Sequence, residues 1–493
     1  MTHSTTADSL DNLPLYPKGV GVMFMMQLLP MIGFAMIQGL LVLYCINVLD
    51  FTEHHAYSLY AAYSSLVFGM AIVGGYVAEL IGYRLAVKIS LLLTTVGLIV
   101  LFYPGAMAMY IGLACFVIGT ATFVPASYVL LGRLYAKDDQ RRDSGFLISY
   151  IGMNLGAFLA FASVGYIRDH FGFHMAFLVG AVFSALALVL FYFFHDLFKY
   201  QMRDDSELEQ VIRTKSMSMR GYLLCFAAIP VIMLLLRHSA VSNALLIGIG
   251  VFSAFFILSL AYREPSASGW RLVAFLVLIV VAVAFWALYM LAPSALTIFV
   301  ERNVDRQVLG FTIPTPSVQG LNPFFIVTLG PILSYIWLRM ARKNRSLSTP
   351  MKFAIGVLLM GIGYVILKIG ISFANQQGLS SFGWVVGSYL FQTMGELFIG
   401  PVGFAMVGSL VPERYEGVMM GIWQLSTGVA GAMSSVLAQS TTDPSGSTAP
   451  LITDHLFASS FGEFGTLAII IGVLTLFLAP LLRYIINSPE PEL

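Results

Sequence analysis

The amino-acid sequence predicts an all-α membrane protein with about 14 transmembrane helices. Its 493 residues are 58% hydrophobic and only 10% charged, whereas a soluble globular protein carries about 25% charged residues. Apolar runs of roughly 20 residues recur along the chain, and each is long enough to cross about 30 Å of hydrocarbon as a helix. The runs are continuous and do not alternate with a period of two, which excludes a membrane β-barrel.

Hydropathy places the predicted segments in order along the chain. The first begins after a short polar stretch that has neither the basic region nor the apolar region of a cleaved signal peptide. Polar connections separate the others. The predicted segments are 19–48, 56–80, 85–104, 106–134, 144–167, 173–196, 220–238, 241–262, 270–298, 319–340, 352–374, 381–411, 416–438 and 462–486.

The distribution of basic residues predicts the orientation of the helices. Alternate connections contain Lys and Arg, as in "IGYRLAVK", "GRLYAKDDQRR" and "RMARKNRSLSTPMK", whereas the opposite set, such as "ANQQGLSS", contains almost none. The positive-inside rule therefore places the basic connections and both termini in the cytoplasm. We expect an integral protein of the bacterial inner (cytoplasmic) membrane.

A charged connection after the sixth segment divides the chain into two halves. Six helices precede it and eight follow, and the first two of the eight look like an inserted hairpin because they hold no polar residue at mid-membrane depth. Two six-helix bundles are the layout of transporters built from pseudo-symmetric halves. The predicted units are a flexible N-terminal tail at 1–17, a six-helix bundle at 18–198, a cytoplasmic linker at 199–219, the hairpin at 220–262, a second six-helix bundle at 263–487 and a C-terminal tail at 488–493.

Several classes of function are excluded by what the chain lacks. Its net charge of +1 provides no basic field for nucleic acid. The three cysteines, Cys45, Cys115 and Cys225, have no CxxC spacing and predict packing, not a metal or redox site. The sequence contains no GxxxxGK[ST] phosphate loop, which excludes an ATP-driven pump. It also contains no nucleophile–base pair that would indicate an enzyme. We expect no cofactor, a small-molecule solute and the lipid bilayer as partners, and function as a monomer.

Four motifs carry a resemblance to a known family. The stretch "GGYVAELIGYR", with Glu79 and Arg84 able to pair at the membrane edge, resembles the loop signature of the major facilitator superfamily, with Glu where Asp is usual. The stretches "SYIGMNLG", "LNPFF" and "YLFQTMGELFIGPVGFAMVGSLVP" resemble the fifth, eighth and tenth helices of the proton-dependent oligopeptide transporter family. The similarity runs from about residue 16 to 487 and is greatest to bacterial di- and tripeptide permeases. It implies the major facilitator fold, with two six-helix bundles and an inserted hairpin.

The resemblance implies the following site. Glu396 matches the carboxylate that contacts a peptide's amino terminus, and an acid at mid-membrane depth is a functional candidate in its own right. Asn154 and Asn322 match side chains that bond the peptide backbone, although a helix kink at Asn322 is an equal alternative. Trp423 matches a cavity aromatic, and a packing role is an equally good interpretation. We expect these residues to face one central cavity with Gln27, and we add Tyr289 and Gln319 as further substrate-binding candidates.

The chain departs from the family in its N-terminal half. The first-helix pattern E-x-x-E-R-F-x-Y-Y supplies proton-linked acids and an Arg, but the matching residues here are Gln27, Pro30, Met31, Ile32, Phe34 and Ala35. The fourth-helix Lys is Val124, the second-helix Tyr is Phe68, and Leu291 is among the residues where a seventh-helix Glu or Gln is expected. An amide cannot titrate, so we expect proton coupling to be weakened or carried by Glu396 alone.

Lys368 is a charge without a counterpart in the resemblance. It lies about 24 Å along a helix from Lys352, towards the outer edge of the bilayer. The favoured interpretation is a side chain that extends outward to the interface. The alternative is a buried Lys paired with a carboxylate such as Glu396. Glu396, Glu79, Arg84 and Lys368 are therefore the candidates for coupling or gating.

The leading hypothesis is a secondary transporter of peptides or peptide-like solutes that works by alternating access. Glu396 would bind the ammonium group, and Asn154 and Asn322 the amide groups. A second hypothesis is transport or export of a solute without a free carboxylate, such as a modified peptide or a siderophore-like compound. A third is a sensor on a transporter fold that moves no solute.

Overall fold

The computed structural model describes residues 17–135, 142–198, 215–264, 266–343, 347–412 and 415–487. The predicted tails, except Pro17, and most of the predicted linker lie outside the described residues. Almost all of the described chain is helical, as predicted. Eleven helices are long and apolar enough to cross a membrane, and a bent pair makes a twelfth span. Helices α15 (Phe382–Leu410) and α16 (Glu416–Gln439), of 29 and 24 residues, are also long enough.

The N-terminal half contains one more helix than predicted because the second segment is broken. Its helices are α1 (Gly19–Asn47), α2 (Glu53–Gly69), α3 (Ala71–Ile81), α4 (Tyr83–Phe102), α5 (Ala106–Gly132), α6 (Arg142–Phe171) and α7 (Phe173–Phe194), followed by the 3-10 turn η1 (His195–Phe198). Helices α2 and α3 meet at Met70 with a bend of 42°. No proline marks this bend, so hydropathy alone predicted a single span.

The hairpin consists of α9 (Lys215–Arg237) and α10 (Ser239–Arg263). The expectation that it holds no polar residue at mid-membrane depth is wrong, because Ser253 lies in the middle of α10. Its hydroxyl donates to the carbonyl oxygen of Ile249 at 2.8 Å, so the polar group is satisfied within its own helix.

The C-terminal half differs from the prediction in two segments. The segment predicted at 270–298 is α11 (Ser266–Tyr289), a break, and α12 (Ala295–Asn303). The last helix, α17 (Pro450–Asn487), begins earlier than predicted. The remaining elements are the 3-10 turn η2 (Thr315–Gly320), α13 (Leu321–Arg342) and α14 (Thr349–Ser372).

Four short strands cover one end of this half. Strand β1 (Val304–Asp305) pairs in parallel with β4 (Ser380–Ser381). Strand β2 (Gln307–Val308) pairs antiparallel with β3 (Phe311–Thr312). Leu309 and Gly310 form the turn between β2 and β3 with φ of 51° and 85°, the positive values that a two-residue hairpin requires.

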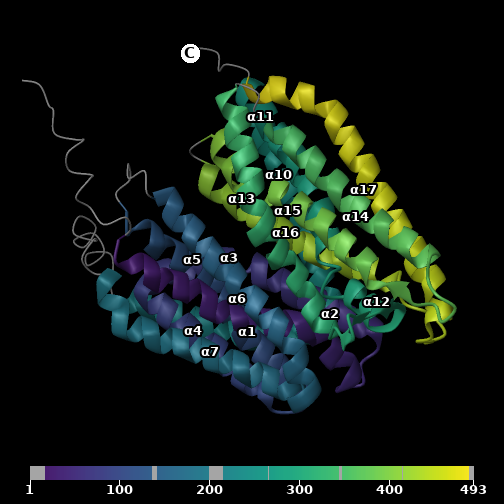
Figure 1. Cartoon of the computed structure of the whole chain (residues 1–493). Coiled ribbons are helices and arrows are strands. Elements are labelled where there is room, and N and C mark those ends of the chain that lie inside the picture. Colours follow the sequence, from purple (N-terminus) through teal and green to yellow (C-terminus); the bar gives the residue numbers. More distant parts are fainter. Residues whose placement is uncertain are drawn as a thin grey trace, which may run out of the picture.

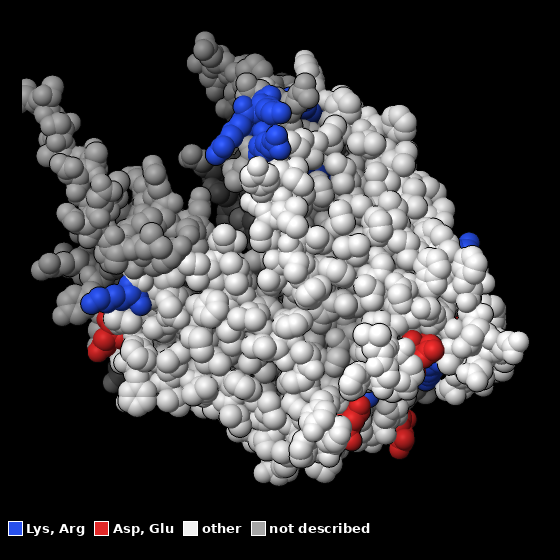
Figure 2. Space-filling model, in the orientation of Figure 1, with Lys and Arg blue, Asp and Glu red and all other residues white. Residues whose placement is uncertain are grey.

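The two halves form separate lobes (Figure 1). Helices α1 and α3–α7 lie in one lobe and α11 and α13–α17 in the other, while α2 lies where the lobes meet, near α12. On the face in Figure 2 the charged side chains gather towards the two ends and leave a band between them almost free of charge. Such a band is the surface that a lipid bilayer covers.

Small residues allow the helices of each half to pack closely. A Cβ placed on Gly74 of α3 would lie 2.2 Å from the carbonyl oxygen of Ala121 on α5. Likewise, a Cβ on Gly361 of α14 would lie 2.7 Å from the carbonyl oxygen of Gly465 on α17, and a Cβ on Gly465 would lie 2.9 Å from the carbonyl oxygen of Gly361. Close backbone approach at small residues is the usual basis of helix association in membranes.

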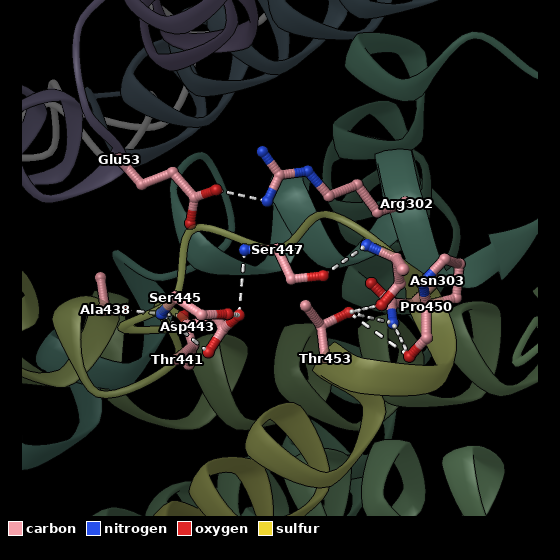
Figure 3. Close-up of polar contacts among 11 residues, drawn as sticks. Glu53, Arg302, Asn303, Ala438, Thr441, Asp443, Ser445, Ser447, Pro450 and Thr453 are labelled. Atoms are coloured by element: carbon pink, nitrogen blue, oxygen red, sulfur yellow. Dashed lines mark hydrogen bonds and ion pairs between the residues drawn. The ribbon is translucent and has the colours of Figure 1, made fainter.

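The halves meet at one end of the molecule, which we call the Glu53 end; the end that holds residues 17 and 487 is the terminal end. At the Glu53 end, Glu53 of α2 forms an ion pair with Arg302 of α12 (Figure 3). Deeper in the interface, a Cβ on Gly428 of α16 would lie 2.9 Å from the carbonyl oxygen of Ser65 on α2. The structure is therefore closed between its halves on the Glu53 side.

Other polar contacts at the Glu53 end join parts of one half. Asn303 of α12 donates from Nδ2 to Oγ1 of Thr453 and to Oδ1 of Asp454, both at 2.9 Å (Figure 3 draws the first). The Asp443 side chain accepts bonds from the backbone N–H groups of Ser445 and Ser447, at 3.2 and 2.9 Å. The Ser445 hydroxyl also donates to this carboxylate. That bond is the main cause of a lowered pKa of the Asp443 carboxyl, and the two backbone N–H groups contribute to the same shift. These bonds order the loop that leads to α17.

Two neighbouring glycines provide a matched test of helix packing. Gly74→Ala should destabilise the protein by about 1–3 kcal/mol, because the added methyl group overlaps the Ala121 backbone. Gly75→Ala should change stability little, since its nearest neighbour would be 3.6 Å away, on Pro125. Thermal unfolding of the purified variants in detergent measures both. Equal transition midpoints for the two variants would contradict the packing described here.

Candidate functional site

Glu396 lies in the interior of the C-terminal half, on α15. Asn322 of α13 donates from Nδ2 to Glu396 Oε2 at 2.6 Å, and also to Oγ1 of Thr393 at 3.2 Å. The Tyr289 hydroxyl at the end of α11 donates to Asn322 Oδ1 at 3.3 Å, and it bonds Glu396 as well. Glu396 is partly exposed although Gly395 and Leu397 are buried. Three helices therefore converge on one carboxylate in the interior of this half.

The local fold explains why Asn322 reaches this acid. The chain enters α13 through the 3-10 turn η2, so α13 begins at Leu321, and Asn322 and Pro323 occupy its first turn. Proline is tolerated there because the first N–H groups of a helix have no internal partner. The start of α13, with its partial positive charge, lies beside the carboxylate and favours an anion. Asn322 and Pro323 therefore lie at the start of a helix and not in a helix interior, where a proline would produce a kink.

The N-terminal half contributes Asn154 and Tyr150 of α6. Asn154 is buried, and its Nδ2 donates to the Tyr150 carbonyl oxygen at 3.0 Å. The Tyr150 hydroxyl bonds the Asn154 side chain and is near enough to Glu396 to feel its charge across the two halves. The structure thus brings Asn154, Tyr289, Asn322 and Glu396 into one region. Sequence reasoning missed Tyr150 and Thr393, although both lie inside the quoted motifs.

Gln27 of α1 bonds a residue of its own half. It is buried, and its Nε2 donates to the Ser127 hydroxyl of α5 at 3.0 Å. Ser127 in turn donates to the Val124 carbonyl oxygen at 2.9 Å. Neither α1 nor α5 carries an acidic or basic residue. The Gln27 amide thus joins two helices of the same half, α1 and α5.

Two further candidates lie apart from Glu396. Gln319 is buried and donates from Nε2 to Oγ1 of Thr297 at 3.2 Å. Trp423 is 2% exposed and packs on Phe353, with ring centroids 6.2 Å apart, and on Gly403. In this structure Trp423 occupies the packing position that was the alternative to a cavity position. The roles of both residues in substrate binding stay predictions.

The other gating candidates, Glu79, Arg84 and Lys368, are exposed or partly exposed. Among the ion pairs of the described residues, none joins Glu79 to Arg84, so the pair expected from the motif does not form. Glu79 is exposed on α3, and Gly82, with φ of 87°, turns the chain before Arg84 on α4. Lys368 is exposed and lies over Gly462 of α17. Its pairing with Glu396 is also absent from the described contacts, and Glu396 is bound by Asn322 instead.

A cavity of about 570 Å³ lies away from this site. It is bounded by α10, α11, α16 and α17, and nearly all of its lining is aliphatic. The hydroxyls of its two serines, Ser253 and Ser426, bond carbonyl oxygens of their own helices at 2.8 and 2.6 Å. It offers no free polar group to a peptide. Within the described residues, no cluster of side chains fits a metal ion.

Comparison with known proteins agrees with this arrangement. A family model described as POT family (PTR2) matches residues 72–454. Dipeptide and tripeptide permease B of Yersinia enterocolitica is 28% identical over 487 residues, which cover 97% of each chain. Dipeptide and tripeptide permease A of Salmonella typhi is 30% identical, with 95% of this chain and 93% of the permease covered. A crystal structure of the peptide transporter POT in complex with alafosfalin has a TM-score of 0.83 at 27% identity, and 96% of each chain is covered.

The family match spans most of the chain, and the similarity in fold extends over both halves and the hairpin. The relatives are transporters and not enzymes. This chain therefore belongs to the POT family of peptide transporters.

Proposed function

We propose that the protein moves peptides or peptide-like solutes across the bacterial inner membrane by alternating access, with both termini in the cytoplasm. The observation that carries the proposal is the buried Glu396 carboxylate, which accepts a hydrogen bond from Asn322. A carboxylate inside a membrane is costly unless it has partners or a function. A solute ammonium group would replace or join the Asn322 amide as its partner.

The two halves provide a route of access to the site. They are joined at the Glu53 end, where the Glu53–Arg302 ion pair and the contact of Gly428 with α2 hold them together. A solute at Glu396 would therefore enter or leave on the terminal side in this state. Opening the Glu53 end, with closure of the terminal end, would expose the same site to the opposite side of the membrane.

The N-terminal half favours a particular kind of solute. Its helices α1 and α5 carry no cation to receive a peptide's carboxylate. An apolar pocket cannot compensate for the dehydration of that group. Solutes with an ammonium group and a masked or missing carboxylate therefore fit the site best, and export of such compounds is the second candidate function. Any proton coupling would depend on Glu396, because Gln27 cannot titrate.

Glu396→Gln should reduce uptake about 10- to 100-fold, because the neutral amide loses a charge-assisted bond to the solute ammonium. Any part of the uptake driven by a pH gradient should disappear with it. Uptake into proteoliposomes at equal protein levels measures this effect. Glu463→Gln, which removes the exposed acid at position 463 of α17, is the matched control and should transport normally. Undiminished transport by Glu396→Gln would contradict the assigned role.

The apolar N-terminal half predicts the solute preference. A dipeptide with an amidated carboxyl terminus should be taken up faster than the same dipeptide with a free carboxylate, at acidic and at neutral outside pH. An N-acetylated dipeptide lacks the ammonium group and should not be transported. Competition against one labelled solute in proteoliposomes ranks all three. Strong, pH-driven accumulation of the free dipeptide would show that the carboxylate is recognised by groups that we have not identified.

The Glu53–Arg302 ion pair should favour the state described here. Glu53→Gln should shift the population towards an open Glu53 end about two- to fivefold, the effect of one partly exposed ion pair. Spin labels at the exposed positions Tyr103 and Leu309 report the separation of the halves by electron–electron distance measurement. Glu301→Gln is the control, because Glu301 pairs with Arg306 of the same half, at 3.8 Å. A distance distribution unchanged by Glu53→Gln would contradict this role.

A further inference from the structure

The inserted hairpin is attached to both halves, but at opposite ends of α10. At the Glu53 end, Ser239 donates to the Ser58 hydroxyl of α2 at 2.9 Å. Asn243 donates from Nδ2 to the Ser58 carbonyl oxygen at 3.1 Å. All three side chains are buried. We call these three residues the Ser58 cluster; they fasten the tip of the hairpin to the N-terminal half.

At the terminal end, α10 is fastened to the C-terminal half. It ends at Arg263, and α11 begins at Ser266. The next residue after α10, Glu264, accepts a bond from the Tyr415 hydroxyl at 3.1 Å, just before α16. A Cβ on Gly269 of α11 would lie 2.3 Å from the Ala261 carbonyl oxygen. Helix α10 thus runs from one half to the other.

Between these two attachments, α10 contacts the C-terminal half through apolar groups. Gly250 approaches Val429 of α16, and the cavity of about 570 Å³ separates much of the same face from α11, α16 and α17. Helix α9 follows the N-terminal half, since a Cβ on Gly221 would lie 2.3 Å from the side chain of Ile81. The face of α10 towards the C-terminal half is therefore the loosely packed surface of the hairpin.

We propose that α10 is a pivoting tether: its tip stays with the N-terminal half through the Ser58 cluster, while its apolar face moves over the C-terminal half each time the Glu53 end opens. Polar bonds inside a membrane are costly to leave unpaired, whereas apolar contacts can be exchanged for lipid at little cost. When the halves separate, the apolar contact of α10 with the C-terminal half should therefore break before the Ser58 cluster does. The cavity provides the space that α10 needs to tilt relative to α11, α16 and α17. This inference rests on the alternating access proposed above.

Two disulfides at different positions along α10 provide the test, in full-length protein whose Cys45, Cys115 and Cys225 are replaced by Ala. Ser58→Cys with Ser239→Cys joins the tip to α2. Gly250→Cys with Val429→Cys joins α10 to α16, where a Cβ on Gly250 would lie 3.5 Å from Cβ of Val429, within the range that disulfides adopt. Copper phenanthroline closes each bridge, and a thiol reductant opens it. Uptake of a labelled peptide solute is measured in both states.

The tether predicts that the bridge between residues 250 and 429 lowers uptake at least about tenfold and that reduction restores it. The bridge between residues 58 and 239 should leave uptake within about twofold of the reduced protein. The opposite pattern, or equal inhibition by both bridges, would overturn the proposal. So would full uptake with the bridge between residues 250 and 429 closed.

A distance measurement separates this proposal from the proposed function, because it needs no transport. Spin labels at Val241, near the exposed side of the tip, and at Tyr103 of the N-terminal half should give one distance. Labels at Val241 and Val436 of α16 should give two populations when the pH or the solute is varied. Asn243→Ala should broaden the first distribution, and Ser253→Ala, whose hydroxyl bonds only its own helix, should not. Two populations between positions 241 and 103 with one between 241 and 436 would overturn the tether even if transport is never observed.

Discussion

A carboxylate inside a membrane is the constraint around which the C-terminal half is arranged. Glu396 can remain there because Asn322 donates to it at 2.6 Å and the Tyr289 hydroxyl lies beside both groups. To bring the amide into place, the chain divides the span that contains Asn322 into the 3-10 turn η2 and the helix α13, which starts next to the acid. The irregular backbone of this segment lies inside the protein, the one kind of place in a bilayer where it is tolerated.

The polar groups outside this site show how the two halves can move while each remains intact. Within a half, bonds such as that of Gln27 to Ser127 and close glycine contacts hold the helices rigidly. Between the halves, the contacts of the described residues include one ion pair, the approach of α2 to α16, the contact of Gly165 of α6 with Pro314, and the Ser58 cluster of the hairpin. A protein built in this way can separate its halves without unpacking either of them. The uncharged Gln27 of the first helix is part of this pattern, because its bond to Ser127 lies within its own half.

The helical membrane fold, its two halves and the hairpin could be predicted from the sequence because apolar length is a strong signal. Glu396 and Asn322 could be found because an acid or an amide within an apolar segment is costly and therefore indicates a functional site. The bend at Met70 and the short α12 could not, since no proline or charge marks them. The packing of Trp423 on Phe353 and the bond of Gln27 to Ser127 could not be predicted either. Helical spacing indicates which face a residue occupies but not which neighbour meets it. Asn243 went unnoticed in the hairpin because its partner, Ser58, is distant in the sequence.

The central claim is that the Glu396 carboxylate itself binds the solute and holds any proton that moves with it. Infrared difference spectroscopy of the protein in membranes, recorded with and without an amidated dipeptide, tests this claim most directly, with Glu396→Gln to assign the carboxyl band. Our account predicts a carboxyl band that is absent from Glu396→Gln and that changes frequency or intensity when the dipeptide binds. A Glu396 band unaffected by a dipeptide that demonstrably binds would contradict the account.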